Sequence, residues 1–403
     1  MMNILVVNSG SSSVKFQLLD MEGQERRLIK GIADRIGLDD SFIRLEADGT
    51  AEDRRDLPLP DHRSAFRAVC DVLHDGPHAS IDGVGHRFVH GGETFTESVL
   101  IDDDVMGILR RLSDLAPLHN PPNIMGIEVC REMLQGVPMA AVFDTALHQT
   151  MPPKAYLYGL PAELYERHGI RRYGFHGTSH FYVAHKAAQE LGRRFEDLRL
   201  ITCHLGNGCS ITAFSRGQSV DTSMGFTPLE GLVMGTRCGD LDPAVPLYLV
   251  KDLGMSPEEV DNMLNTESGL KGLCGRRDMR DIVEQARQGD TAGRTAIEVF
   301  VYRIQKYIGA YTAVLGGVDA IVFTAGIGQN SDTIRKEVLR PFGYLGLKID
   351  DARNRLGRTV FSADESKVYA MTIATDEELV IARDTYELVT RPVHLTERRD
   401  RLP

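Results

Sequence analysis

Several signals that decide the class of a protein are missing from this chain of 403 residues. It has no basic run of the kind that binds nucleic acid, and its formal net charge is −11, with 46 Lys and Arg against 57 Asp and Glu. Nucleic acid and anionic membranes are therefore poor partners on electrostatic grounds, and we expect the chain to bind neither. An anionic ligand would have to be held by local cations and backbone N–H groups.

Cysteine pairs and apolar spans are missing too. The six cysteines form no Cys-x-x-Cys pair, so we expect them to be reduced and buried. The apolar segment 1–7 is short and has no basic flank, so we do not interpret it as a signal peptide. The apolar stretch 311–328 carries Asp319 and several glycines, which argues against a membrane span. These absences together predict a soluble, cytoplasmic protein.

The common nucleotide-binding motifs are absent as well. No Lys is followed by Ser or Thr, which excludes a Walker A loop, and no G-x-G-x-x-G string occurs. The Asp-Phe-Gly and His-Arg-Asp motifs of protein kinases and the His-Glu-x-x-His motif of zinc proteases are also missing. If this chain binds phosphate, it must do so through a different motif.

What the sequence does contain is an internal repeat. Segments 4–18 and 200–214 each place an apolar strand, a tip of small residues and a second, alternating strand in succession, which is typical of a β-hairpin. In each half a later strand runs into glycines, over 81–92 and 318–328. Helical periodicity marks 291–316. This order predicts an α/β fold built from two copies of one unit, with two unrelated hairpins as the alternative.

Both hairpin tips suit a phosphate group. The tip within 8–15 holds Gly10 and three serines, and Lys15 lies on the returning strand, so N–H groups, hydroxyls and one cation come together. A solvated Ser-rich turn is the alternative. The second tip, 206–208, repeats the small residues and favours the phosphate interpretation.

Two arginines stand where an arginine is unusual. Arg87 lies in a strand that is otherwise apolar, where a cation is costly unless it is paired or functional. Its planar fork fits a carboxylate or a phosphate, and a structural salt bridge is the alternative. Arg237 lies in a turn flanked by glycine, where a surface role is equally consistent with the sequence.

Segment 173–180 places His176 and His180 four residues apart. Zinc would explain the pair, but Gly177 and the expected capping residues Thr178 or Ser179 intervene, so we expect His176 to precede the helix. An imidazole that donates to developing negative charge is the better interpretation.

Two further candidate site segments come directly after apolar strands. Asp144 follows the apolar strand 139–143, a place where a catalytic or orienting acid often lies. Segment 325–330 follows the strand 321–323, and we expect a glycine turn there that lets a nucleotide approach the backbone closely.

These motifs resemble those of the acetate kinase family, within the actin/sugar-kinase/Hsp70-like ATPases. Segments 6–15 and 85–92 are similar to its two signatures. The other similar segments are 116–123, 142–146, 173–180, 204–208, 266–270, 278–281 and 325–328. The resemblance implies two duplicated actin-like (ribonuclease H-like) domains with an interdomain active-site cleft. It implies a first domain of residues 1–147 plus the C-terminal helix of about 380–403, and a second, nucleotide-binding and dimerising domain of residues 148–379.

The resemblance also implies a role for each matching residue. The implied catalytic residues are Arg87, Asp144, His176 and Arg237. The implied acetate-binding residues are Arg87, Val89, Leu118, His119, Phe175 and Pro228. The implied nucleotide-binding residues are Ser11, Ser13, Lys15, His204, Leu205, Gly206, Asn207, Gly208, Asp278, Met279, Arg280, Gly326, Ile327, Gly328, Gln329 and Asn330. The implied metal-binding residues are Asn8 and Glu377.

The choice of Glu377 has separate support in the sequence. Segment 375–378 fits a capping box, which would use Glu378 to cap a helix and leave Glu377 for the metal; Glu378 is the alternative metal residue. Two departures from the family pattern lie on the nucleotide side. Gln329 stands where the family usually has Glu, and the loop 275–277 is shorter and more basic than usual.

The activity implied by the resemblance is reversible phosphoryl transfer from ATP to acetate, giving acetyl phosphate and ADP. Mg²⁺ is the implied cofactor, with Mn²⁺ able to replace it, and a homodimer is the implied assembly. Since a carboxylate is ionised at neutral pH, the reaction needs no strong base, and we expect Asp144 to orient an arginine or the metal shell. The alternatives are a kinase that prefers propionate or butyrate and an ATPase of the same superfamily that is not a kinase.

Overall fold

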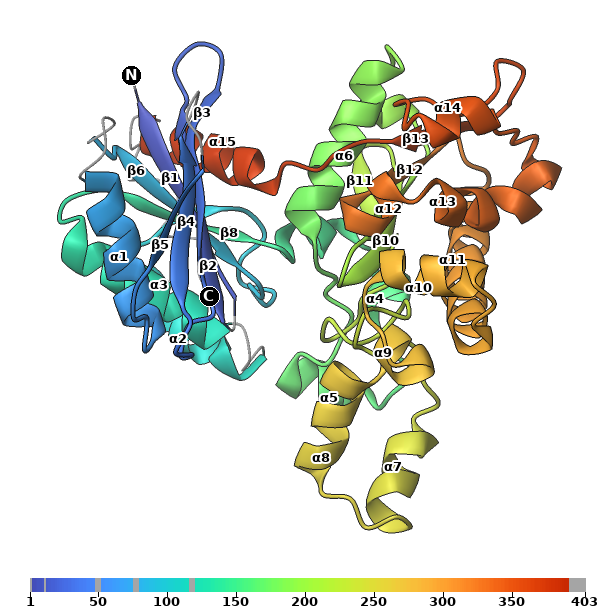
Figure 1. Ribbon diagram of the computed structural model, residues 1–403, viewed down its shortest axis with the longest axis horizontal. Helices are drawn as coiled ribbons and strands as arrows, with labels where there is room; N and C mark the ends of the chain where they lie inside the picture. Colours follow the sequence, from blue (N-terminus) through green and yellow to red (C-terminus); the bar gives the residue numbers. More distant parts are fainter. Residues whose placement is uncertain (1, 11, 48–51, 75–79, 116–119, 391–403) are drawn as a thin grey trace. The chain divides into compact units, whose positions relative to one another are not determined.

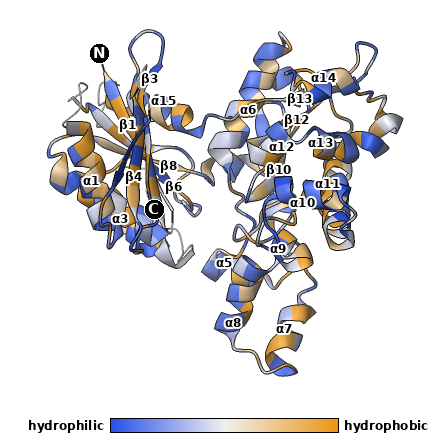
Figure 2. Cartoon of the chain, in the orientation of Figure 1, coloured by the Kyte–Doolittle hydropathy of each residue, from blue (hydrophilic) through white to orange (hydrophobic). Residues whose placement is uncertain are grey.

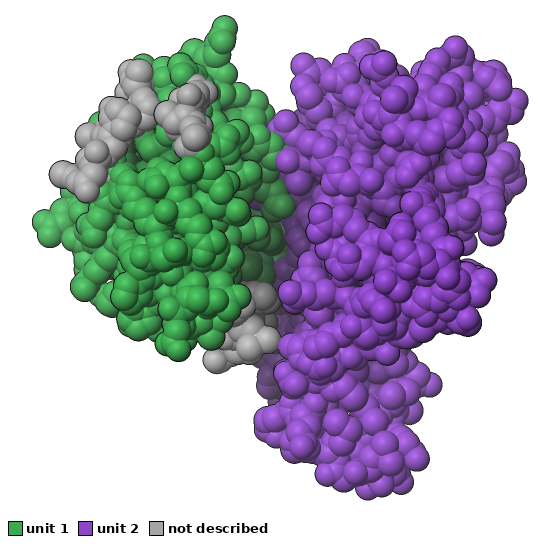
Figure 3. Space-filling model, in the orientation of Figure 1, with its two compact units in different colours: residues 1–146, 376–403 green, residues 147–375 purple. Residues whose placement is uncertain are grey.

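The computed structural model describes residues 2–10, 12–47, 52–74, 80–115 and 120–390. The chain divides into two compact units, each with its own sheet (Figures 1 and 3). Unit 1 is Met1–Ala146 with Asp376–Pro403, and unit 2 is Leu147–Thr375. Three residues of the predicted site, Ser11, Leu118 and His119, lie outside the described residues.

Unit 1 contains a mixed sheet of eight strands, ordered β5-β4-β3-β2-β1-β6-β8-β7. Its strands are β1 (Asn3–Ser9), β2 (Ser13–Asp20), β3 (Arg26–Asp34), β4 (Phe42–Ala47), β5 (Asp53–Asp56), β6 (Gly83–Phe88), β7 (Val99–Leu100) and β8 (Met139–Phe143). Its helices are α1 (His62–His74), α2 (Asp103–Arg111), η1 (Leu112–Leu115), α3 (Asn120–Met133) and α15 (Glu377–Thr390). The predicted hairpin is confirmed, because β1 and β2 pair antiparallel from Asn3↔Asp20 to Ser9↔Val14.

The apolar run that begins this chain is explained by burial of both faces of β1, whose hydrophobic colour is visible in Figure 2. Leu5 and Val7 belong to a core that also contains Phe66 of α1, whereas Ile4 and Val6 pack with Ile381 of α15. Alternate residues of a strand point to opposite faces, so a strand covered on both sides is apolar throughout. The C-terminal helix therefore completes unit 1.

Gly85 permits this close approach of α15. A Cβ atom at Gly85 would lie 2.4 Å from Oγ1 of Thr385 and 2.7 Å from Cγ2 of Ile381. Neither distance is possible without movement of the helix, so any side chain at Gly85 would displace α15 from the sheet.

Unit 2 contains a mixed sheet of five strands, ordered β11-β10-β9-β12-β13. Its strands are β9 (Leu200–Leu205), β10 (Cys209–Ser215), β11 (Gln218–Thr222), β12 (Ala320–Thr324) and β13 (Tyr369–Thr372). Its helices are η2 (Ala146–Thr150, which begins at the last residue of unit 1), α4 (Pro153–Tyr156), α5 (Ala162–His168), α6 (Gly177–Glu190), η3 (Phe195–Asp197), α7 (Ala244–Lys251), α8 (Pro257–Asn262), η4 (Met263–Glu267), α9 (Gly269–Cys274), α10 (Met279–Arg287), α11 (Thr291–Leu315), α12 (Ala325–Asn330), α13 (Asp332–Leu339), η5 (Arg340–Leu345) and α14 (Asp351–Arg355).

The two sheets share one five-stranded pattern. In β11-β10-β9-β12-β13 the first two pairs are antiparallel and the last two are parallel. In β3-β2-β1-β6-β8 of unit 1 the same pairings occur in the same order. The predicted α/β class and its internal repeat are therefore confirmed.

Three local predictions about helices are wrong. Segment 325–330 is not a glycine turn but the helix α12, which Ala325 enters at φ +61°. The helix α15 is capped by Asp376, whose Oδ1 accepts from the N–H of Leu379 at 3.0 Å, so the predicted capping box from Thr375 to Glu378 does not form. The helix α6 begins at Gly177, so neither Thr178 nor Ser179 is its N-cap; His176 precedes the helix, as predicted.

Candidate functional site

In unit 1 the predicted residues Arg87 and Asp144 form a two-point ion pair. Nε of Arg87 donates to Oδ1 of Asp144 at 2.9 Å, and Nη2 donates to Oδ2 at 2.7 Å. The strands β6 and β8 bring them together, since they pair parallel up to Phe88↔Phe143 and the N–H of Asp144 donates to the carbonyl of Phe88 at 3.1 Å. The salt bridge considered for Arg87 thus exists, and it fixes one edge of the guanidinium.

Asn8 and Glu377 lie beside the same guanidinium. Nη1 of Arg87 donates to Oδ1 of Asn8 over 3.4 Å, and Oε2 of Glu377 lies 4.0 Å from Nη2. Burial alone would lower the pKa of Arg87, but the carboxylates of Asp144 and Glu377 outweigh it and raise that pKa above its ordinary value. One cation and two carboxylates leave an excess of negative charge, which suits a further cation.

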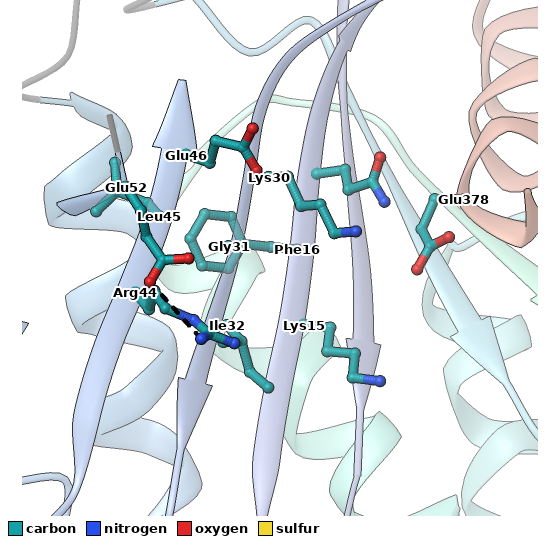
Figure 4. A pocket seen from close by; sticks show the side chains of 11 residues that line it. Lys15, Phe16, Lys30, Gly31, Ile32, Arg44, Leu45, Glu46, Glu52 and Glu378 are labelled. Atoms are coloured by element: carbon teal, nitrogen blue, oxygen red, sulfur yellow. Dashed lines mark ion pairs between the residues drawn. The ribbon is translucent and has the colours of Figure 1, made fainter. Parts of the chain in front are cut away.

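A pocket of about 320 Å³ lies over β2, β3 and β4, with Glu378 of α15 also lining it (Figure 4). The first hairpin tip is closed by the N–H of Gly10, which donates to the carbonyl of Ser13 at 2.7 Å, and the exposed Lys15 follows on β2. Figure 4 shows Lys15 and Glu378 lining this pocket from β2 and α15. Burial raises the pKa of Glu378, Glu377 and Asp376 raise it further, and Lys15 lowers it.

In unit 2 the second hairpin tip lies beside two predicted catalytic residues. A Cβ atom at Gly208 would lie 3.4 Å from Nε2 of His176 and 3.7 Å from Nη1 of Arg237. The tip is held by two backbone bonds, from the N–H of Gly206 to the carbonyl of Gly208 and from the N–H of Gly235 to the carbonyl of Asn207, both 3.0 Å. The structure therefore brings His176, Arg237 and the tip together.

His176 is held in an unusual backbone conformation. Its φ is +58°, in the left-handed region that side chains rarely adopt. Its ring stacks on that of His204 with centroids 4.1 Å apart, and its Nδ1 lies 2.9 Å from Oγ of Ser210. Leu205, which follows His204, is buried at the end of β9. No signal in the sequence pointed to Ser210.

Arg237 is half-buried and has no carboxylate partner among the described residues. Its one side-chain hydrogen bond there runs from Nη1 to the carbonyl of Pro228 at 3.2 Å. Burial lowers its pKa, and Cys209 partly offsets that effect. A cation enclosed without a counter-ion is typical of a site that receives an anion.

The loop that carries Pro228 and Arg237 is fixed by a network that the sequence did not reveal. Oε1 of Glu230 accepts from Nη2 of Arg172 at 2.5 Å, and Oε2 accepts from the hydroxyl of Tyr158. Nη1 of Arg172 in turn donates to three successive carbonyls, 222–224, at 2.9–3.0 Å. These contacts join residues far apart in the sequence, so no local pattern could show them.

The residues predicted to surround the adenosine lie at the start of α10 and in α12. Asp278 caps α10 and pairs with Arg280, Nη2 to Oδ2 2.6 Å, and these hydrogen bonds lower the pKa of Asp278 to about 2. The side chain of Met279 is buried. Gly326, Ile327, Gly328, Gln329 and Asn330 all lie in α12.

The C-terminal end of α12 is held by Arg335, a residue that no pattern in the sequence indicates. Arg335 is 1% exposed, and its Nη1 donates to the carbonyls of Gly328 at 3.0 Å and of Gln329 at 2.7 Å. Its Nε donates to Oδ1 of Asn354 at 2.8 Å.

The predicted acetate-binding residues that are described belong to both units. Val89 lies in unit 1 and is 9% exposed, whereas Phe175 and Pro228 lie in unit 2. The carbonyl of Phe175 lies 3.1 Å from Nε2 of His148, which anchors the segment before His176.

The described part of the chain holds no cluster of three or more His, Cys, Asp or Glu side chains that could by itself bind a metal ion. None of its helices combines the length and the apolar character needed to cross a bilayer.

A duplicated α/β unit with a small-residue hairpin in each sheet, and with an arginine side chain beside each hairpin, is typical of actin-like phosphotransferases. A sequence model of the acetokinase family matches residues 3–383, and the chain belongs to that family. The acetate kinase of Halothermothrix orenii is 52% identical over 397 residues, which cover 96% of this chain and 100% of that protein. The acetate kinase of Coprothermobacter proteolyticus is 53% identical over 398 residues, 96% of this chain and 99% of that protein.

Solved structures agree with this assignment. A propionate kinase from Francisella tularensis has a TM-score of 0.92 and 43% identity, over 96% of this chain and 100% of that one. The acetate kinase of Porphyromonas gingivalis has a TM-score of 0.90 and 41% identity, over 96% of this chain and 100% of that one. The family resemblance stated from the motifs is therefore confirmed.

Proposed function

We propose that this chain is an acetate kinase that transfers the terminal phosphoryl group of ATP to acetate, reversibly and in one in-line step. The structural observation that carries the proposal is Arg237, a half-buried cation beside His176 and the second hairpin tip that has no carboxylate partner in the described ranges. Membership in the acetokinase family supports the same conclusion.

In unit 1, Arg87 would bind an anion together with the cation that balances the two carboxylates beside it. Asp144 occupies Nε and one N–H of Nη2, so the guanidinium cannot rotate. Nη1 makes a single long bond, to Asn8, within the part of the chain that the structure describes. The remaining N–H groups can donate to a carboxylate or phosphoryl oxygen without any rearrangement, which lowers the cost of reaching the transition state.

In unit 2, Arg237 and His176 would stabilise the phosphoryl group during transfer. Charge accumulates on its oxygens, and fixed N–H donors are more effective than water because they need no reorientation. The tips 8–15 and 206–208 would supply backbone N–H groups and Lys15 to the nucleotide phosphates. Acetate is already ionised, so no residue has to act as a strong base.

The residues of unit 1 fit Mg²⁺. Asn8 and Glu377 offer amide and carboxylate oxygens, the donors that Mg²⁺ prefers, and few protein ligands are needed because substrate phosphates and water complete its shell. When bound with ATP, the ion neutralises phosphate charge, and Mn²⁺ would serve in its place. Glu377 is the better candidate because it lies at Arg87, whereas Glu378 lines the pocket with Lys15.

The nucleotide would be bound by unit 2. We propose that His204, Leu205 and the tip line its phosphates, and that segments 278–280 and 326–330 surround its adenosine. The carbonyls of Gly328 and Gln329 are held by Arg335, so this part of α12 is rigid before the nucleotide arrives.

A methyl-sized pocket would select acetate. We assign this acyl selectivity to Val89, Leu118, Phe175 and Pro228. A kinase that prefers propionate is the second candidate, since a protein of that name from Francisella tularensis is 43% identical. One methylene changes selectivity by only about 1–3 kcal/mol, so both acids should react, acetate the faster.

We also propose a homodimer formed through unit 2. Large apolar side chains on and beside α7, whose hydrophobic colour is visible in Figure 2, are exposed: Leu247 and Tyr248 by 55% each and Leu253 by 58%. Apolar clusters of this kind commonly mark interfaces between subunits. Light scattering on the purified chain should give twice the mass of 44.7 kDa.

The reverse reaction tests the proposed function. The purified chain is incubated with ADP, Mg²⁺ and acetyl phosphate, and ATP is measured by luminescence. We expect ATP to appear only when acetyl phosphate is present. Release of inorganic phosphate without ATP would instead identify a hydrolase.

A further inference from the structure

Four side chains of unit 2 form a continuous hydrogen-bonded chain that ends at His176. Oγ1 of Thr202 lies 2.7 Å from Nδ1 of His180, and Nε2 of His180 lies 2.7 Å from Oγ of Ser210. The same Ser210 oxygen lies 2.9 Å from Nδ1 of His176. Thr202, His180 and Ser210 are fully buried, on β9, α6 and β10.

The ring of His180 carries a single proton. Its burial disfavours the charged form and lowers its pKa well below the usual range, and His148 and His204 lower it further. No carboxylate contacts it among the described residues. One of its two ring nitrogens therefore donates and the other accepts.

The hydroxyl of Thr202 decides which nitrogen donates. This buried hydroxyl has no partner other than Nδ1 of His180 in the described ranges, so its hydrogen must be donated there or be left unsatisfied. Nδ1 of His180 then accepts, and Nε2–H donates to Ser210. Ser210 already accepts that bond, so its own hydrogen is donated to Nδ1 of His176, the other partner in reach.

We propose that Thr202, His180 and Ser210 are positioning residues that hold His176 in the tautomer with its proton on Nε2. That nitrogen faces the second hairpin tip, since a Cβ atom at Gly208 would lie 3.4 Å from it. His176 would thus be an uncharged, fixed donor at the place assigned to the transferring phosphoryl group. The tautomer follows from the hydrogen bonds and from the burial of His180, whereas its catalytic value rests on the proposed function.

Nitrogen-15 NMR of the ring-labelled histidines tests the tautomer without any activity measurement. A His176→Gln variant identifies the His176 signals by their disappearance. In the wild-type chain we expect a protonated Nε2 and an unprotonated Nδ1. A protonated Nδ1 would overturn the proposal, because the hydrogen bonds that link Thr202, His180, Ser210 and His176, here called the relay, would then be donated in the opposite direction.

Two variants break the relay at different links. Ser210→Ala removes the donor to His176, and Thr202→Val removes the hydroxyl that orients His180 with little change in shape. We expect both to give a mixture of His176 tautomers. Thr212→Val is the matched control. It removes a buried hydroxyl on the same strand as Ser210, one that is bonded to Thr222 at 3.0 Å, and it should leave the His176 signals unchanged.

Kinetics separate the relay from the proposed function. We expect Ser210→Ala to lower kcat about tenfold, less than the ~10²–10³-fold loss caused by deleting a donor outright, with both KM values nearly unchanged. A wild-type His176 signal in both Ser210→Ala and Thr202→Val would refute the relay. The predicted tautomers in a chain that does not phosphorylate acetate would refute the proposed function instead and leave the relay standing.

Discussion

Arg87 and Asp144 face each other at the ends of two neighbouring parallel strands and share two hydrogen bonds, of 2.9 and 2.7 Å. The side chain of Asp144 is 1% exposed and that of Arg87 is 19% exposed. One edge of the guanidinium is thus used to hold the side chain, and we propose that the other edge binds a substrate anion. This division of roles underlies the first two predictions.

Arg87→Lys should leave unit 1 folded and remove most of the activity. A lysine has one point charge, so it cannot bond both oxygens of Asp144 and a substrate anion in the same geometry. We expect kcat/KM for acetate to fall, and the fall should correspond to a loss of about 2–4 kcal/mol of transition-state stabilisation. Activity within a few-fold of the wild type, with an unchanged circular dichroism spectrum, would mean that Arg87 is structural.

Asp144→Asn should reduce both activity and stability. The amide removes the charge that balances a largely buried guanidinium, and we expect the free energy of unfolding to fall by about 1–3 kcal/mol. Asp103→Asn is the control in urea denaturation, since Asp103 is 98% exposed in its pair with Arg131 and that pair should contribute little. Unchanged kinetics for Asp144→Asn would exclude an essential role for this carboxylate.

Gly85→Ala should loosen the C-terminal helix. The new methyl group would overlap Thr385 and Ile381 of α15, and overpacking of this kind costs about 1–3 kcal/mol. Gly107→Ala in α2 is the control, because its Cβ would meet only Nη1 of Arg111, at 3.8 Å, and alanine favours a helix. Equal unfolding midpoints for the two variants would contradict the close packing of α15.

Val89→Ala should widen the acyl pocket. Removal of two methyl groups makes room for longer acids. Each methylene of the acid that becomes buried there should stabilise binding by about 0.8 kcal/mol. We expect kcat/KM to shift from acetate toward propionate and butyrate, with the KM for ATP unchanged. Val69→Ala, on the buried face of α1 in the core of unit 1, should lower stability without changing that ratio. If Val89→Ala keeps the wild-type ratio, Val89 does not line the acyl site.

The repeated sheets could be predicted from the sequence because the signals are local. Alternating apolar residues around a tip of small residues identify a hairpin wherever they occur, and 4–18 and 200–214 form hairpins as expected. The helix Thr291–Leu315 also has local signals, the cap Asp290 and the left-handed Gly316 at its end.

The failed predictions have different causes. The glycines of 325–330 indicated a turn, but this segment forms α12, and Arg335 binds the carbonyls at its end from six and seven residues further along the chain. Thr375 and Asp376 are both good caps, so the sequence could not decide between them. Ser210 and Glu230 have partners 34 and 58 residues away, His176 and Arg172, so their roles became visible only in the structure.

We propose that acetate accepts the phosphoryl group while Arg237 binds an anion of that reaction. Trapping acetyl phosphate as its hydroxamate, in a mixture of the chain, ATP, Mg²⁺ and acetate, is the most direct test. We expect hydroxamate only when all components are present, and a loss of about 10²–10³-fold in the rate for Arg237→Ala. Consumption of ATP at the same rate without acetate, or an undiminished rate for Arg237→Ala, would contradict it.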